Sequence, residues 1–296
     1  MLDIIIIGAG TAGLCAGIYA SRAGKNVLII ESNNYGGQII NSIDVENYPG
    51  ISHISGFDFA SNLYNQAIAC GCKYINEKVE KIEDNNTVKT NKNTYKTKAI
   101  IIATGLKKRA LGLYSESDFI GKGISYCATC DGNFYKNKDV AIVGGGNTAL
   151  EDALYLSKIC NKVYLIHRTN SFRGEEKYLD NLHTLENVNI LTNTNVISLN
   201  GDNVLESITI RNNNEDKILN ISCLFIAIGQ MPDNLKFSNI IKLDEKGYII
   251  SKNCETNQPN IFVAGDARTK DLRQLVTAAS DGAIAATKAI NYLNEV

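Results

Sequence analysis

The chain has 296 residues, of which 44% are hydrophobic and 21% are charged, and its formal net charge is -1. This length allows two domains with a sizeable buried core, and the composition is that of an ordinary folded protein rather than a disordered chain or a coiled coil. The near balance of charge and the lack of a long Lys/Arg run give no electrostatic footprint for nucleic acid, so we expect no nucleic-acid partner.

No stretch of the sequence approaches the roughly 20 apolar residues of a membrane span. The first apolar run, residues 4–7, lacks the length and the basic flank of a secretory signal. We therefore expect no membrane association and a cytoplasmic location. Of the eight cysteines, only Cys127 and Cys130 form a CxxC. In a reducing compartment this pattern favours one catalytic pair over a disulfide framework.

A dinucleotide-binding unit is predicted at the start of the chain. Gly8 permits the tight turn, Gly10 lets the backbone approach a pyrophosphate, and Gly13 lets the helix pack close to the strand. Amide groups at the helix start then face the phosphates. Glu31 follows at the distance where a carboxylate accepts hydrogen bonds from ribose hydroxyls. The predicted elements are a strand at 3–7, a helix from 11 to about 23 and a strand at 26–30.

Residues 57–69 then have helical periodicity, and short strand-like pieces follow at 73–75 and 87–90. A strongly apolar strand at 98–103 ends in Thr104-Gly105, and the run 224–228 before Gly229 has the same form. Both are typical of the end strands of doubly wound α/β units.

The CxxC lies between two nucleotide-binding patterns. Two cysteines with this spacing can close a small disulfide loop or hold one side of a metal site. Asp131, directly after Cys130, favours a redox pair, because a disulfide that opens and closes repeatedly needs a group that supplies and removes protons. A zinc-binding module would need a second close Cys/His pair, and the three histidines are scattered. We therefore predict no metal site.

The second nucleotide-binding pattern is an internal repeat of the first, shifted by about 136 positions. Strands are predicted at 139–143 and 162–166, with the glycine turn and helix start at 144–149 between them. His167, Arg168 and Arg173 stand where the first copy has Glu31. Guanidinium groups grip a 2′-phosphate through paired hydrogen bonds, whereas a carboxylate repels it, so the second site should prefer NADP(H).

An apolar strand at 261–264 leads into Gly265-Asp266, an acid at a strand end where a ligand crevice is expected, and a helix is predicted over 274–293. These elements follow the second copy, so one domain is interrupted by the other. The predicted fold is α/β, with two Rossmann-like dinucleotide-binding domains, the second inserted into the first. We expect one domain at 1–111 and 238–296 and the inserted domain at 112–237.

Taken in order, these motifs closely resemble the low-molecular-weight thioredoxin reductases, flavoproteins of the pyridine nucleotide-disulfide oxidoreductase class. The resemblance covers essentially the whole chain, and CATCDG at 127–132 is its most specific part. It implies a homodimer that binds FAD in the first domain and NADPH in the inserted one. Hydride would pass from NADPH to the flavin and then to the disulfide, and the dithiol would reduce thioredoxin.

The resemblance also implies residue roles. Cys130 would be the thiol next to the flavin, Cys127 the one that attacks thioredoxin, and Asp131 the acid/base. The implied FAD-binding residues are Gly8, Gly10, Gly13, Glu31, Gly37, Gln38, Asp266, Arg273 and Gln274. The implied NADPH-binding residues are Gly144, Gly146, Asn147, Thr148, His167, Arg168 and Arg173. A rotation of the domains about connections near 111 and 238 is implied as well.

Two positions depart from the family pattern. Thr169 replaces a second arginine, which should narrow the preference for NADPH over NADH, and Asn133 replaces an aromatic that helps to hold thioredoxin, although Phe134 and Lys122 remain candidate contacts. The alternative is a reductase of the same fold with another donor, ferredoxin or NADH, or with another small dithiol protein as partner. Ferredoxin-dependent relatives tend to lose the second glycine motif, and peroxiredoxin reductases usually carry an extra amino-terminal domain. A flavin-linked ferredoxin–NADP reductase would not need the CxxC.

Overall fold

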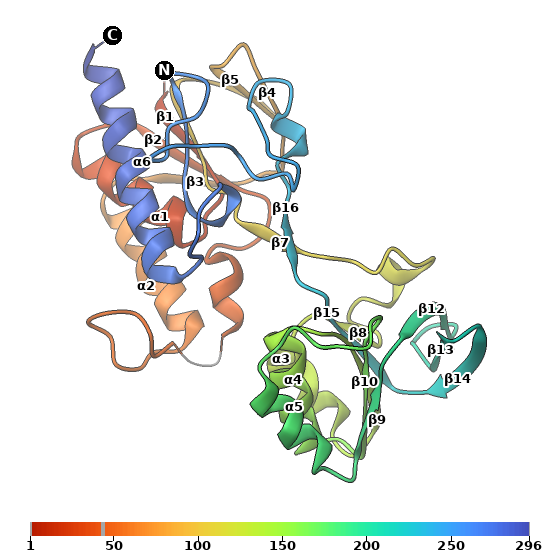
Figure 1. Ribbon diagram of the computed structural model, residues 1–296. Coiled ribbons are helices and arrows are strands. Elements are labelled where there is room, and N and C mark those ends of the chain that lie inside the picture. Colours follow the sequence, from red (N-terminus) through yellow and green to blue (C-terminus); the bar gives the residue numbers. More distant parts are fainter. Residues whose placement is uncertain (1, 43–44, 296) are drawn as a thin grey trace. The chain divides into compact units, whose positions relative to one another are not determined.

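The protein, described here by a computed structural model that covers residues 2–42 and 45–295, divides into two compact units. Unit 1 comprises Met1–Lys107 and Met231–Val296, and unit 2 is Lys108–Gln230 (Figure 1). The predicted α/β fold, with one glycine-loop domain inserted into another, is confirmed. The boundaries lie at 107/108 and 230/231, against the expected 111/112 and 237/238.

The sheet of unit 1 has a parallel part in the order β3-β2-β1-β6, with β17 also paired to β6. Strands β4 and β5 extend it as an antiparallel ribbon along the first half of β6. The isoleucines of β1 are at most 3% exposed, as expected for a strand covered on both faces. The strands are β1 Leu2–Ile7, β2 Val27–Glu31, β3 Lys73–Asn76, β4 Val79–Glu83, β5 Thr87–Thr90, β6 Thr94–Ile102 and β17 Ile261–Val263.

Helices α1 (Thr11–Arg22), α2 (Gly56–Ala69) and α6 (Leu275–Glu295) cover one face of this sheet (Figure 1). Helices α1 and α6 cross closely because Gly282 has no side chain: an added Cβ would lie 2.3 Å from the Ala12 carbonyl oxygen. The opposite face packs against β4, β5 and the segment around Phe237. The last helix of the chain is thus part of the same core as the first.

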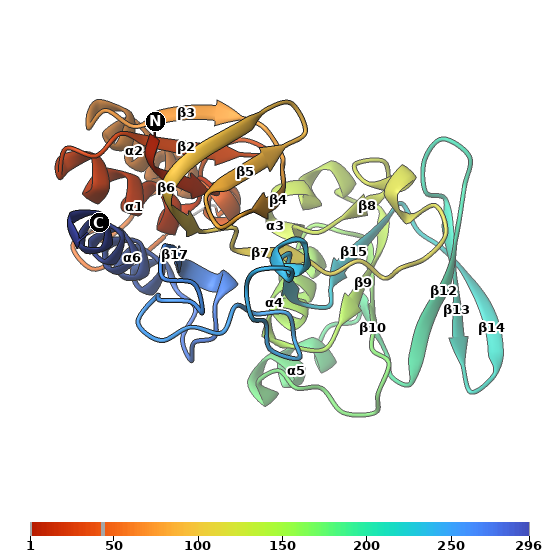
Figure 2. The same ribbon diagram turned by 90° about the horizontal axis from the view of Figure 1, so that it is seen from above.

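The sheet of unit 2 is parallel, in the order β11-β10-β9-β15-β8. Helices α3 (Ala128–Asp131), α4 (Asn147–Ser157) and α5 (Glu176–His183) lie on one face. On the other face packs an antiparallel meander, β12-β13-β14, seen at the edge of Figure 2. The strands are β8 Ile124–Ser125, β9 Asp139–Gly144, β10 Lys162–Ile166, β11 Val188–Leu191, β12 Thr194–Asn200, β13 Ser207–Asn212, β14 Glu215–Asn220 and β15 Cys223–Ala227.

The chain passes between the units twice, through β7 (Leu106–Lys108) and β16 (Gln230–Pro232). These two short strands pair with each other as a separate two-stranded sheet. The two crossings therefore form one hydrogen-bonded ribbon. Within residues 2–42 and 45–295, no helix has the length and apolar character needed to cross a membrane.

Candidate active site

The two predicted redox thiols form a disulfide in unit 2. The short helix α3 begins directly after Cys127, whose Sγ accepts a hydrogen bond from the Cys130 amide at 3.3 Å. Cys130 is exposed and Cys127 is half-buried. Over the described part of the chain, no group of three or more His, Cys, Asp or Glu side chains could hold a metal ion.

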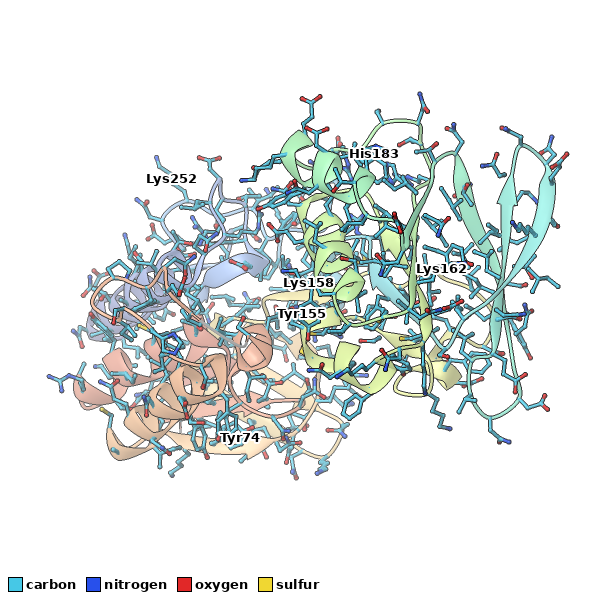
Figure 3. The ribbon with its side chains drawn as sticks, turned by 90° about the horizontal axis from the view of Figure 1, so that it is seen from below. Tyr74, Tyr155, Lys158, Lys162, His183 and Lys252 are labelled. Atoms are coloured by element: carbon cyan, nitrogen blue, oxygen red, sulfur yellow. A yellow bond between two sulfur atoms is a disulfide. The ribbon has the colours of Figure 1, made fainter. Side chains whose placement is uncertain are left out.

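Helix α3 is held in place by close packing on α4. At Gly132, an added Cβ would lie 3.0 Å from the ring of Tyr155 and 3.1 Å from Leu156 Cδ2, so the chain after α3 approaches α4 only because this residue is glycine. Tyr155 is labelled on α4 in Figure 3. The disulfide thus rests on the helix that follows the second glycine turn.

Asp131 is tied to the disulfide segment through a serine that the sequence did not single out. Ser125, the last residue of β8, is 4% exposed and lies 2.6 Å from Asp131 through Oγ and Oδ2. The Cys127 amide donates to the same hydroxyl at 3.0 Å, and the Cys127 carbonyl lies 3.3 Å from it. The predicted acid/base and the backbone of Cys127 therefore share one buried hydroxyl.

Two further charged residues, Lys108 and Asp152, lie near the disulfide segment and Asp131. Lys108 donates through Nζ to the carbonyl of Tyr126, directly before Cys127. Burial lowers the pKa of Lys108, and the nearby charges of Asp152 and Asp131 oppose that shift. Burial raises the pKa of Asp152 to about 6, against the opposing effect of Lys108. Neither Lys108 nor Asp152 belongs to a sequence motif that would have marked it.

Replacing Asp152 with asparagine is expected to flatten the pH dependence of stability. Its pKa rises from an ordinary 3.8 to about 6 on folding. Below about pH 4 both states hold the proton, between about pH 4 and 6 only the folded state does, and above that both are ionised. The contribution of Asp152 to the free energy of unfolding therefore falls as the pH rises from about 4 to about 6 and stays low above it.

Thermal unfolding of the wild type and of Asp152→Asn at pH 5 and pH 8 measures this effect. The melting temperature of the variant, relative to that of the wild type, should be higher at pH 8 than at pH 5. Asp180→Asn, which changes an exposed carboxylate of α5, should leave the wild-type pH dependence intact. An identical change of melting temperature with pH in all three proteins would contradict the raised pKa of buried Asp152.

The first glycine turn brings several predicted FAD-binding residues together in unit 1. Glu31 Oε2 accepts from the Ala9 amide at 2.8 Å, which fixes the carboxylate beside the turn. Gly37 approaches Gly10 so closely that an added Cβ would lie 3.0 Å from the Gly10 Cα. Gln38 donates to the Leu106 carbonyl at 2.7 Å. These residues lie near the carboxyl ends of the parallel strands, where a ligand crevice is expected in this class of fold.

The carboxyl-terminal part of unit 1 adds the remaining predicted FAD-binding residues. Gly265 lies against Ala12 at the start of α1, with an added Cβ 2.9 Å from the Ala12 Cβ. Next to it, Asp266 Oδ1 and Arg273 Nε are buried and have no hydrogen-bond partner among the described residues. A groove of about 500 Å³ lies beside Gln274. Two buried polar atoms without partners among the described residues are what a hydroxyl-rich and amide-bearing cofactor would satisfy.

The second glycine turn, in unit 2, is closed by the loop that carries the predicted arginines. The amides of Arg173 and Gly174 donate to the Gly145 carbonyl at 2.7 and 3.2 Å. Asn147 and Glu175 exchange two hydrogen bonds of 3.0 and 2.7 Å. The predicted NADPH-binding residues at 144–148 and Arg173 therefore lie together.

His167 and Arg168 lie in different surroundings, the first buried and the second exposed. His167 is 7% exposed, stacks on Phe172 at 4.7 Å between ring centroids and packs so closely on Gly145 that an added Cβ there would lie 2.1 Å from its ring. Its Nε2 lies 2.8 Å from Thr169 Oγ1, and burial lowers its pKa. Arg168 is exposed. Thr169, which departs from the family pattern, thus fixes the imidazole that supports the glycine turn.

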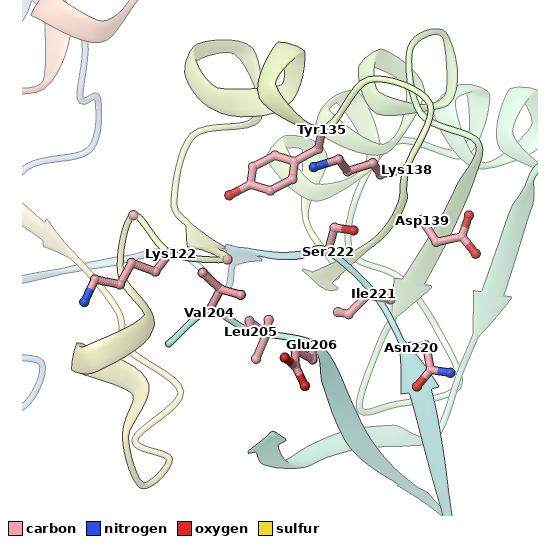
Figure 4. Close-up of a pocket in the computed structure, with 12 residues that line it drawn as sticks. Lys122, Tyr135, Lys138, Asp139, Val204, Leu205, Glu206, Asn220, Ile221 and Ser222 are labelled. Atoms are coloured by element: carbon pink, nitrogen blue, oxygen red, sulfur yellow. The ribbon is translucent and has the colours of Figure 1, made fainter. Parts of the chain in front are cut away.

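A separate groove of about 700 Å³ lies at the opposite end of the same sheet, before the first residues of β9 and β15. Figure 4 shows Tyr135 and Lys138 on one side of it and Leu205 and Glu206 on the other. The glycine turn follows the carboxyl end of β9, so this groove is not the predicted nucleotide site.

Comparison with known proteins identifies the family to which the chain belongs. Residues 2–282 match the family model described as pyridine nucleotide-disulphide oxidoreductase, so the chain belongs to this family. It is 38% identical to a thioredoxin reductase of Listeria monocytogenes, over 99% of this chain and 94% of the relative. A thioredoxin reductase of Helicobacter pylori is 40% identical over 99% of both chains. The crystal structure of Lactococcus lactis thioredoxin reductase matches with a TM-score of 0.87 and 33% identity over the whole of both chains.

The family implies flavin and nicotinamide cofactors for this enzyme.

Proposed function

We propose that this protein is a thioredoxin-disulfide reductase that uses FAD and NADPH. The observation that carries the proposal is the Cys127–Cys130 disulfide, followed by Asp131, in a unit that also holds a glycine turn with arginines beside it. Full-length similarity to proteins named thioredoxin reductase supports the same activity.

FAD would be held in unit 1 by the first glycine turn, Glu31, Gly37, Gln38, Asp266, Arg273 and Gln274. The unpaired atoms Asp266 Oδ1 and Arg273 Nε and the open backbone at Gly10, where an added Cβ meets only the Gly37 Cα at 3.8 Å, fit such a ligand. A bound flavin would supply the two electrons that convert the disulfide into a dithiol.

NADPH would be held in unit 2 by Gly144, Gly146, Asn147 and Thr148, with Arg168 and Arg173 toward the 2′-phosphate. Both arginines are exposed and flank the turn, as a site that receives a doubly charged group requires. For His167 we propose a supporting role, because its ring is buried beneath Gly145.

In the dithiol state, Cys127 would attack one sulfur of the disulfide of thioredoxin as a thiolate. A mixed disulfide forms, and the first thioredoxin sulfur leaves as a thiolate that takes a proton. Cys130 then attacks Cys127 Sγ, which restores the Cys127–Cys130 disulfide and releases the second thioredoxin thiolate. Asp131 would take the proton from a thiol that must attack and return it to a sulfur that leaves.

The partner would be thioredoxin or a related small dithiol protein, and the active form a homodimer in the cytoplasm. These statements rest on the relatives and on the sequence. The second glycine turn, complete from Gly144 to Ala149, favours NADPH over ferredoxin as the donor.

Anaerobic titration of the yellow protein with NADPH and, separately, with NADH tests the proposal. The flavin absorbance should bleach rapidly with NADPH, and the electrons should appear as thiols of added thioredoxin. Bleaching by reduced ferredoxin but by neither nucleotide would reject the donor and leave the disulfide assignment standing.

Replacing Arg168 with alanine is expected to raise the KM for NADPH roughly 10-fold or more, the value of a hydrogen bond between charged groups, and to change the KM for NADH little. Steady-state kinetics with both nucleotides measures the difference. Arg211→Ala, which removes an exposed arginine of the meander paired with Asp216, should change neither constant. Equal increases in the KM for NADPH and the KM for NADH would contradict the proposed contact between Arg168 and the 2′-phosphate.

A further inference from the structure

Ser125 occupies a fixed position between the strand and the redox helix. Its backbone is in register with Phe225 on β15, which is 1% exposed, so the serine is anchored in the core of unit 2. The side chain reaches out of β8 to Asp131, six residues further along the chain, and accepts a hydrogen bond from the Cys127 amide between them. A serine at this place carries a polar group into a buried site, and such a group is costly unless its hydrogen bonds are used.

The contacts of this hydroxyl use its proton and one of its two acceptor positions. A serine hydroxyl has one proton and two acceptor positions. The Cys127 amide, 3.0 Å away, occupies one acceptor position. The proton has two acceptors within reach, Asp131 Oδ2 at 2.6 Å and the Cys127 carbonyl at 3.3 Å. The shorter contact has the length of a hydrogen bond from a hydroxyl to an ionised carboxylate.

The two proton acceptors allow Ser125 to serve both protonation states of Asp131. When Asp131 is ionised, the hydroxyl donates to Oδ2. When Asp131 holds a proton, its O–H can donate to the second acceptor position of Ser125, whose own proton then turns to the Cys127 carbonyl. Asp131 therefore keeps a hydrogen bond in both states, and the exchange needs only a rotation of one hydroxyl.

We propose that Ser125 is a positioning residue that holds Asp131 in place, in both of its protonation states, throughout thiol–disulfide exchange. The proposal rests on the proposed function of Asp131 as the acid/base. An alanine at 125 would remove the hydrogen bond that fixes the Asp131 carboxylate, and the amide of Cys127 would lose its acceptor. The expected loss is therefore in the exchange chemistry and not in nucleotide or thioredoxin binding.

A double-mutant cycle between Ser125→Ala and Asp131→Asn tests the proposal. In the wild-type background, Ser125→Ala should lower the kcat for NADPH-dependent thioredoxin reduction by roughly 10- to 100-fold, the value of a hydrogen bond to a charged group. The KM for thioredoxin should stay unchanged. In the Asp131→Asn background the same change should lower the residual kcat less than about twofold, because residues that act as one unit are not additive.

Two controls separate positioning from damage to the fold. The anaerobic rate of flavin bleaching by NADPH does not involve the disulfide and should be unchanged in Ser125→Ala. Ser157→Ala removes another hydroxyl of unit 2, bonded to the Leu154 carbonyl at 2.8 Å, and should keep the full kcat. Ser125→Thr, which restores the hydroxyl, should recover most of the lost kcat.

Each result has a distinct meaning. An unchanged kcat in Ser125→Ala, an equal loss in both backgrounds, or a loss confined to KM would overturn the role of Ser125 while the reductase activity stands. A wild-type protein that does not reduce thioredoxin with NADPH would overturn the proposed function and this proposal together.

Discussion

Cys127→Ser should lose NADPH-dependent reduction of thioredoxin by at least roughly 10³-fold, the scale seen when a covalent nucleophile is removed. A serine hydroxyl is not ionised at neutral pH and cannot form the mixed disulfide. Flavin bleaching by NADPH should persist, because Cys127 lies in unit 2 outside the proposed FAD site. The fold should also persist, because the disulfide joins residues only three positions apart and constrains little of the unfolded chain.

The measurement is stopped-flow bleaching of the flavin followed by a thiol assay on added thioredoxin. Cys70→Ser is a matched control, because this half-buried thiol of unit 1 lies outside the proposed path. It should retain full turnover. Full turnover in Cys127→Ser would contradict the role of Cys127 and indicate that another thiol pair carries the electrons. Among the other cysteines, Cys70 and Cys72 are the two that lie closest together in the sequence.

Gly13→Ala should cost the protein both its flavin and part of its stability. An added Cβ would lie 1.9 Å from the Gly8 carbonyl oxygen, a backbone atom that cannot move without distorting the turn. Gly8 itself has φ +109 and packs against the Ala103 carbonyl, so the turn has no room to shift. The expected loss in free energy of unfolding is roughly 1–3 kcal/mol or more, as for overpacked core positions.

Gly10→Ala is the matched control for stability. The same atom added at Gly10 meets only the Gly37 Cα, at 3.8 Å, and the backbone there has an ordinary negative φ. The flavin-free protein should therefore unfold within about 1 kcal/mol of the wild type, while flavin binding is lost because the pyrophosphate would meet the methyl group. Chemical denaturation of the flavin-free proteins and fluorescence of released flavin separate the two effects. Equal stability for Gly13→Ala and Gly10→Ala would contradict the packing role of Gly13.

The glycine turns and the buried strands were predictable because each carries a local signal. The run of isoleucines in β1, the turn at 8–13 and helix α1 appear where the sequence indicated them, and α6, Leu275–Glu295, lies within two residues of the predicted 274–293. Such strands are covered on both faces, so their sequence is apolar throughout and independent of the rest of the chain.

Strand β14 of the meander and the connecting ribbon β7-β16 had no comparable signal. Strand β14 has only Leu219 buried, and β7 and β16 are three residues long, so none of them shows a readable apolar period. The domain boundaries fall in this ribbon and were therefore displaced by several residues in the sequence-based expectation.

Ser125 and Lys108 were missed for a different reason. Each acts through a contact made by folding, and neither stands at a fixed spacing within a known motif. Ser125 is the end of a two-residue strand, and Lys108 lies 18 residues before the carbonyl that it contacts. Only the position of Ser125 two residues before Cys127 could have drawn attention to it.

The sheet of unit 1 has a consequence for the order of events on the ribosome. Strand β17 pairs with β6, and α6 packs on α1, so the first third of the chain cannot complete its core until the last segment has emerged. Unit 2 is a contiguous segment that ends at Gln230 and can fold earlier. Asp266 and Arg273 also lie in the late segment. The disulfide segment can therefore fold before the proposed FAD site is complete.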